Sequence, residues 1–103
     1  MTVLHLTPGE AEEKRFLIVL RSLLRQVNQV CRREGNPNLT LDDLPEIPEE
    51  CSLLGLELRR SPYSWPIEES YWVEAIEPEL GHVKGNLWII SYKAHRLRKK
   101  GVL

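Results

Sequence analysis

The stretch YWVEAIEPELGHVKGNLWIISYKAHRLRKKG, from Tyr71 to Gly101, decides the fold of this 103-residue chain. Residues 70–77 send alternate side chains to opposite faces, which is the pattern of a β-strand. Residues 86–91 are rich in β-formers and predict a second strand after a glycine-containing loop. Ser91 can cap a helix from Tyr92 to Lys100. We therefore expect a β-hairpin followed by a helix over residues 70–101.

A long helix is expected near the N-terminus, over residues 7–35. Thr7 can cap it, Pro8 suits its first position and Glu10 completes a capping box, while Gly35 ends it. Apolar side chains recur at intervals of three and four and predict one buried face: Phe16, Leu20, Leu23, Val27 and Val30, widened by Leu17, Leu24 and Cys31.

Five consecutive apolar residues, Phe16 to Leu20, surround this helix on all sides. Ile18 and Val19 therefore point away from the main stripe, and an exposed apolar patch marks a contact. The proline-rich middle segment is one possible cover. The others are a second copy of the chain, which would make a homodimer, and a host protein partner.

The expected fold class is α+β, with residues 1–103 forming a single domain, as suits this length. The long helix (7–35) and an irregular proline-rich wrapper (36–69) are expected to pack on the C-terminal hairpin and helix (70–101). Within the wrapper, residues 40–44 predict a short helical turn. Trp72 and Trp88 lie within the two strands and are expected in the core rather than as stacking platforms.

The composition, with 42% hydrophobic and 28% charged residues, is typical of a soluble globular protein. Cys31 and Cys51 have no Cys or His partners at zinc-site spacing, and we expect both to be buried without a disulfide. The longest apolar run is far shorter than the ~20 residues of a membrane span. No signal-peptide pattern is present, so a cytoplasmic location without membrane contact is expected.

Charge is unevenly distributed along the chain, although the net charge is only −1. Residues 81–103 contain no Asp or Glu, whereas residues 1–80 hold all 15 acidic side chains. Such a separation favours a nucleic-acid surface, although a solvated helix end is an equal alternative. The candidate phosphate contacts are the six basic residues of this segment: Lys84, Lys93, Arg96, Arg98, Lys99 and Lys100.

The order of strand, GHVKGN loop, strand and ISYKAHRLRKKG helix resembles the ββα-metal fold of HNH endonucleases, in particular a phage-associated branch. The segment LTLDDLPEIPEECSLLGLEL is similar to the one that precedes the motif in that branch, so the resemblance covers residues 39–101. It implies a metal-dependent endonuclease that acts on DNA with Mg²⁺ or another divalent cation, in the host cytoplasm if phage-encoded.

The resemblance also implies roles for individual residues. Glu74 and His95 fall at the metal-ligand positions, and Asn86 at that of an Asn that braces the loop by hydrogen bonds. The general-base position falls on Ala75, whose methyl group cannot accept a proton. His82 in the loop is a candidate replacement base.

Each candidate also has an ordinary structural alternative. Glu74 would be the cross-strand partner of a lysine, His82 a solvent-facing loop residue, and His95 a surface residue on a basic helix. Three functions follow: an HNH-like nuclease, a catalytically inactive module that binds nucleic acid, or a small phage protein that binds and modulates a host protein.

Overall fold

The computed structural model describes residues 7–103, and its longest element is helix α1, Pro8–Glu34. The Thr7 hydroxyl accepts a hydrogen bond from the backbone N–H of Glu10 at 3.2 Å. Gly35 ends the helix in the left-handed conformation, with φ 76°. Both caps therefore act where the sequence predicts them, because capping depends on local chemistry.

A two-stranded antiparallel sheet forms the centre of the fold. Strand β1, Tyr71–Ala75, pairs with β2, Leu87–Ser91, and Val73 lies opposite Ile89. A short 3₁₀ turn, η2 (Pro78–Leu80), lies between the strands. Helix α2, Tyr92–Lys99, follows β2 directly and is capped by the Ser91 hydroxyl.

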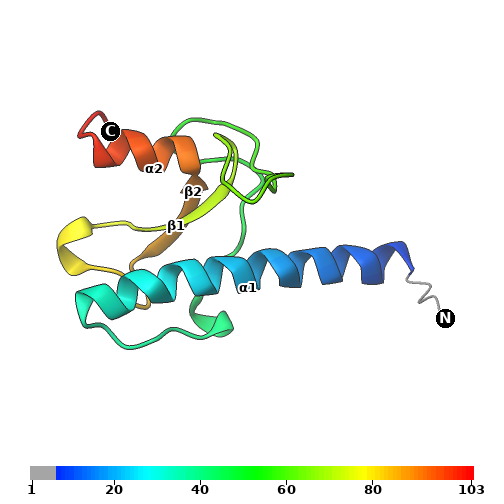
Figure 1. Ribbon diagram of the computed structural model, residues 1–103, viewed down its shortest axis with the longest axis horizontal. Helices are drawn as coiled ribbons and strands as arrows, with labels where there is room; N and C mark the ends of the chain where they lie inside the picture. Colours follow the sequence, from blue (N-terminus) through cyan, green and yellow to red (C-terminus); the bar gives the residue numbers. More distant parts are fainter. Residues whose placement is uncertain (1–6) are drawn as a thin grey trace.

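The sheet lies between the two helices (Figure 1). Helix α2 contacts both strands, whereas α1 contacts β1. Gln26 of α1 accepts a hydrogen bond from the Val73 N–H at 3.3 Å and donates one to the Val73 carbonyl at 3.5 Å. These bonds satisfy part of the open edge of β1, which would otherwise leave backbone groups unpaired. The chain is thus a small α+β fold.

One hydrophobic core joins both helices, both strands and the middle segment. Cys31 and Cys51 are both free and buried in it, as predicted. The middle segment, residues 36–69, is irregular apart from a 3₁₀ turn, η1 (Leu41–Asp43), and an isolated bridge between Glu50 and Glu57. The buried members of the core are Leu23, Val27, Cys31, Cys51, Leu58, Val73, Leu87, Ile89, Ile90 and Ala94.

The predicted buried face of α1 is wrong in its first half. Phe16 and Leu17 are 49% and 43% exposed, because the N-terminal half of α1 projects beyond the body of the protein (Figure 1). The face that packs on the core instead includes Val19, Leu23 and Val27. The middle segment provides only partial cover, since residues 60–66 lie beside Ile18 and Val19 while Ile18 stays exposed. Among the described residues, no helix combines the length and apolar character that crossing a membrane requires.

Candidate functional site

The structure brings together the two residues predicted to bind metal. Glu74 lies on β1 and His95 on α2, and His95 Nδ1 is 2.5 Å from Glu74 Oε2. Because an ionised carboxylate only accepts hydrogen bonds, Nδ1 is the donor. The other ring nitrogen of His95, Nε2, has no protein hydrogen-bond partner within residues 7–103. The side chains of His95 and Glu74 are 20% and 16% exposed, so His95 is partly buried against Glu74.

His82 joins this pair from the loop between the strands. Its Nε2 lies 3.5 Å from Glu74 Oε1, and its Nδ1 lies 3.1 Å from both carboxylate oxygens of Glu34. The backbone N–H of His82 also donates to Glu34 at 2.9 Å, and its carbonyl accepts from the Cys31 thiol at 3.3 Å. The His82 side chain is only 11% exposed, which excludes the solvent-facing alternative.

Carboxylates and imidazoles therefore alternate in the order Glu34, His82, Glu74, His95. A neutral imidazole donates from one nitrogen only, so His82 can donate to both of its carboxylates only when protonated. Burial alone would raise the pKa of Glu74, but the hydrogen bond from His95 and the charges of both histidines and Arg98 lower it overall. The pKa of Glu34 is also lowered, because its bonds with His82 outweigh its partial burial. Both carboxyl groups are thus held in the ionised form.

A cavity of about 560 Å³ opens over this row and is lined by Glu74, His82 and His95. Trp72 forms one wall and stacks on His95, with ring centroids 4.5 Å apart and an angle of 24° between the rings. This stacking restricts the rotation of the imidazole. Trp72 therefore does not behave as the core residue that its strand position predicted, whereas Trp88 packs against the core.

Asn86 makes the loop hydrogen bonds that the resemblance implies. Its side-chain oxygen accepts from the Glu77 N–H at 3.1 Å, and its amide donates to the carbonyls of Glu77 and Gly81 at 3.0 and 2.8 Å. Gly81 has a φ of 75°, and a Cβ added there would lie 3.1 Å from the side chain of Asn36. A side chain at this position would strain the backbone and crowd Asn36 and Glu34, so glycine is favoured where the loop approaches the end of α1.

The pairing and the alternation of β1 decide what lies opposite Glu74 and on which face of the strand Ala75 lies. The residue opposite Glu74 on β2 is Trp88, so the predicted cross-strand lysine partner is wrong. Ala75, at the general-base position, is buried in the other face of the strand. A side chain there points away from Glu74, because successive residues of a strand face opposite sides.

The predicted phosphate contacts are distributed over different surfaces. Arg98 and Lys99 line the cavity, and Arg98 also donates to the carbonyls of Ala75 and Ile76 at 2.8 and 3.1 Å. Arg96 lies on a different side of α2, with its guanidinium 5.9 Å from the centre of the Tyr92 ring. Of these three residues, only Arg98 and Lys99 lie close to the row of carboxylates and imidazoles.

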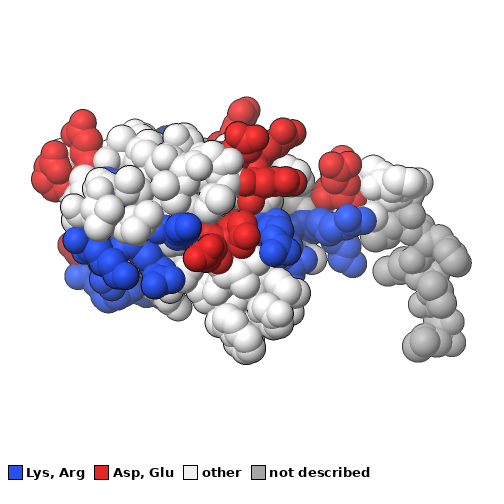
Figure 2. All heavy atoms as spheres, turned by 90° about the horizontal axis from the view of Figure 1, so that it is seen from above, with Lys and Arg blue, Asp and Glu red and all other residues white. Residues whose placement is uncertain are grey.

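The remaining candidates lie further from the cavity. Lys93 pairs with Glu68 at 4.0 Å and Lys84 with Asp43 at 3.7 Å, while Lys100 is exposed beyond the end of α2. Figure 2 shows one group of Lys and Arg side chains at the end of the molecule where α2 ends and a second group further along the same face, with Asp and Glu side chains between and around them. A polyanion would therefore be attracted to separate positions on this face.

Among residues 7–103, no group of three His, Cys, Asp or Glu side chains is arranged to hold a metal ion. Glu74 and His95 still offer an ionised carboxylate and an imidazole, which suit a divalent cation that keeps most of its waters. An ion held by both would replace their direct hydrogen bond. Glu74 and His95 thus provide ligands that fit such an ion, provided that the hydrogen bond between them is broken.

Sequence reasoning missed Glu34 and the stacking of Trp72 on His95. Glu34 lies 48 positions before His82, and the sequence contains no signal that links them. Comparison of the chain with protein-family models, with curated proteins and with solved structures finds no match. The site is therefore interpreted from its own geometry.

Proposed function

We propose that the protein is an HNH-like endonuclease of phage type, or derived from one, and that it acts on DNA. The proposal implies a ββα-metal arrangement of β1, β2 and α2 and, if active, metal-dependent phosphodiester hydrolysis. The observation that carries it is the direct contact between Glu74 and His95, which stand 21 positions apart and were selected from the sequence as a pair. A host-cell cytoplasmic location belongs to the same proposal.

Glu74 and His95 would hold Mg²⁺ or another divalent cation in this proposal. When bound, such an ion stabilises the charge that develops on the phosphate and on the leaving oxygen. Arg98 and Lys99, which line the same cavity, would attract the phosphate. Asn86 acts only indirectly, because its hydrogen bonds fix the loop that carries His82.

His82 is the base in this scheme. Glu34 accepts from its Nδ1, so the neutral ring keeps its lone pair on Nε2, which lies 3.5 Å from Glu74 Oε1 beside the cavity. A carboxylate that orients an imidazole in this way is a recurrent feature of general bases. His82 would thus supply the proton acceptor that Ala75 lacks.

Incubation of the purified protein with supercoiled plasmid and Mg²⁺ or Mn²⁺ tests the proposal. We expect cutting to be lost in Glu74→Gln and His95→Ala and strongly reduced in His82→Ala. Glu79→Gln is the matched control, because Glu79 is an exposed carboxylate of the same loop region. Absence of cutting with both metals would contradict catalysis.

A catalytically inactive nucleic-acid-binding module is the second candidate. The buried Ala75 at the general-base position favours it, together with the basic residues at the end of α2. It predicts DNA binding without metal that weakens steeply as salt rises. Equal affinity at low and high salt would exclude it.

The exposed apolar half of α1 supports a third candidate, a contact through Phe16–Leu20 with a second copy of the chain or with a host protein. Phe16, Leu17 and Ile18 are all exposed on the projecting helix. Light scattering tests the homodimer, since a dimer that Leu17→Glu converts to a monomer would support it. A monomeric chain with no DNA affinity would favour the host protein instead.

A further inference from the structure

A second surface lies between α1 and the loop at residues 60–66, where side chains enclose a groove of about 450 Å³. We call it the α1 groove. Ligand sites in proteins usually have volumes of about 300–1,000 Å³. Two arginines and four aromatic residues give this groove its chemical character: Arg25, Arg60, Tyr63, Trp65, Tyr71 and Trp72.

Two of the aromatic side chains form an exposed stack. The rings of Tyr63 and Trp65 are nearly parallel, at 3°, with centroids 4.8 Å apart. The two residues are nevertheless 57% and 60% exposed, which is unusual for side chains of this size. Each ring covers one face of the other, so a third flat ring can extend the stack from an outer face.

The loop that carries this stack is fixed by its own hydrogen bonds. The Ser61 hydroxyl donates to the Trp65 carbonyl at 2.6 Å and accepts from the Tyr63 N–H at 3.0 Å. The aromatic pair is therefore held in place before any ligand arrives. Such preorganisation reduces the entropy lost on binding.

The charge of the α1 groove is entirely positive. Arg25 and Arg60 line it, no Asp or Glu does so, and within the described chain neither arginine has a carboxylate within 4.0 Å. Serine and glutamine side chains supply the remaining polar groups. This combination suits a ligand with negative charge and flat rings.

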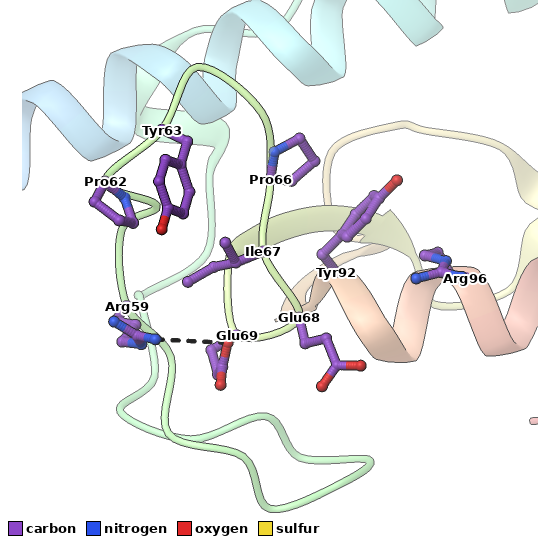
Figure 3. A pocket seen from close by; sticks show the side chains of 9 residues that line it. All are labelled: Arg59, Pro62, Tyr63, Pro66, Ile67, Glu68, Glu69, Tyr92 and Arg96. Atoms are coloured by element: carbon purple, nitrogen blue, oxygen red, sulfur yellow. Dashed lines mark ion pairs between the residues drawn. The ribbon is translucent and has the colours of Figure 1, made fainter.

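A neighbouring hollow of about 490 Å³ beside α2 provides an internal comparison. It shares Tyr63 with the α1 groove, but Glu68 and Glu69 line it, and Arg59 pairs with Glu69 at 4.0 Å (Figure 3). Arg96 and Tyr92 face the same hollow from α2 (Figure 3). The two carboxylates make this hollow less favourable for a polyanion than the α1 groove.

We propose that the α1 groove binds a single-stranded segment of nucleic acid, with a base stacked on the Tyr63–Trp65 pair and phosphates at Arg25 and Arg60. Aromatic platforms combined with a positive groove are the common means of binding single strands. Trp72 lines both the α1 groove and the cavity that contains Glu74. The inference rests on the proposed function in one respect. A nucleic-acid strand in the groove leads toward the Glu74–His95 pair. The substrate class of the proposed nuclease is then nucleic acid with unpaired nucleotides.

Fluorescence anisotropy with labelled 12-nucleotide single-stranded DNA, single-stranded RNA and duplex DNA, without metal and at low salt, tests this inference. We expect at least one single strand to bind more tightly than the duplex, and the DNA and RNA arms identify which. Trp65→Ala should weaken single-strand binding about tenfold or more. Tyr63→Ala should act in the same direction, and both residues are exposed, so the variants should fold.

Arg60→Glu and Arg59→Glu form a matched pair of neighbouring charge reversals. Arg60→Glu should weaken single-strand binding about tenfold and reduce the slope of log affinity against log salt by about one. Arg59 faces the other hollow, so Arg59→Glu should change affinity less than about twofold. Equal effects of the two reversals, or unchanged binding in both aromatic variants, would overturn the inference.

The plasmid assay separates the failure of this inference from the failure of the proposed function. If the protein cuts plasmid with metal, but Trp65→Ala and Arg60→Glu leave single-strand binding unchanged, only the inference about the α1 groove is overturned. If both substitutions weaken single-strand binding, but the protein cuts with no metal, the inference about the α1 groove is supported and only the proposed catalysis is overturned.

Discussion

The two halves of α1 form one continuous helix but have different roles in the fold. Residues 19–34 place Leu23, Val27 and Cys31 in the core, whereas residues 8–18 project from the body and leave Phe16 and Leu17 exposed. The apolar stripe at helical spacing begins at Phe16 in the projecting half and continues through Leu20 and Leu23 in the other half. The comparison shows that periodicity predicts the helix, but that burial depends on which other elements lie opposite each turn.

The largest predicted effect is on the free energy of unfolding, and it distinguishes two leucine-to-alanine substitutions, one in each half of α1. Leu23→Ala removes a buried side chain and should lower the free energy of unfolding by about 3 kcal/mol. Leu17→Ala should change it by less than about 1 kcal/mol, because its side chain is already exposed. Urea denaturation measures both, and equal losses would mean that the N-terminal half is covered in solution.

A smaller effect is expected from Gln26→Ala, which removes the hydrogen bonds between α1 and the edge of β1. The loss should be about 1–2 kcal/mol, because the N–H and carbonyl of Val73 lose their partners. Gln29→Ala, on an exposed position of the same helix, is the control. If both variants unfold at the wild-type urea concentration, Gln26 does not hold α1 on the sheet.

The third prediction concerns the pH dependence of stability and compares one glutamate from each half. Partial burial would raise the pKa of Glu34, but its hydrogen bonds with His82 lower it, so the folded state binds fewer protons than the unfolded state. This contribution is present above the ordinary glutamate pKa, and it is lost as the pH falls through the lowered value.

We therefore expect Glu34→Gln to be destabilising at pH 6, by less than Gln26→Ala, and this difference from the wild type to shrink toward pH 3. Glu13→Gln serves as the control, because Glu13 is exposed on the projecting half. Unfolding free energies measured across this pH range test it. A constant difference for Glu34→Gln would show that its bonds with His82 do not affect stability.

The smallest effect should follow from Thr7→Ala, which removes the N-terminal cap of α1. We expect a loss of about 0.5 kcal/mol, at the low end for such caps, because the first turns of the helix make few tertiary contacts. Amide hydrogen exchange should become faster in these turns and remain unchanged around Val27. Faster exchange throughout α1 would show that the two halves unfold together.

Features that depend on local chemistry could be predicted from the sequence. The caps Thr7, Gly35 and Ser91 mark helix ends because their side chains or backbone conformations satisfy nearby groups. Glu74 and His95 were selected as a pair by the resemblance to HNH endonucleases, and the local patterns of β1 and α2 placed them on a strand and on the helix that follows the hairpin.

Features that depend on distant packing could not be predicted. Glu34 meets His82 only because α1 lies along β1, and that docking is not encoded in either local segment. The exposure of Phe16 depends on the length of the body relative to the helix, and the stacking of Trp72 on His95 depends on how α2 folds back. Sequence patterns describe single elements, whereas these properties belong to pairs of elements.

The link between Glu34 and His82 has a consequence for the order of folding. Glu74 and His95 are 21 positions apart, within one hairpin and the helix that follows it, whereas Glu34 and His82 close a loop of 48 positions. The entropy cost of closure increases with loop length, and distant contacts slow folding. We expect a newly made chain to form the Glu74–His95 pair first and to fix His82 only when α1 docks, so a chain that stops short of docking would leave His82 without the carboxylate that orients it.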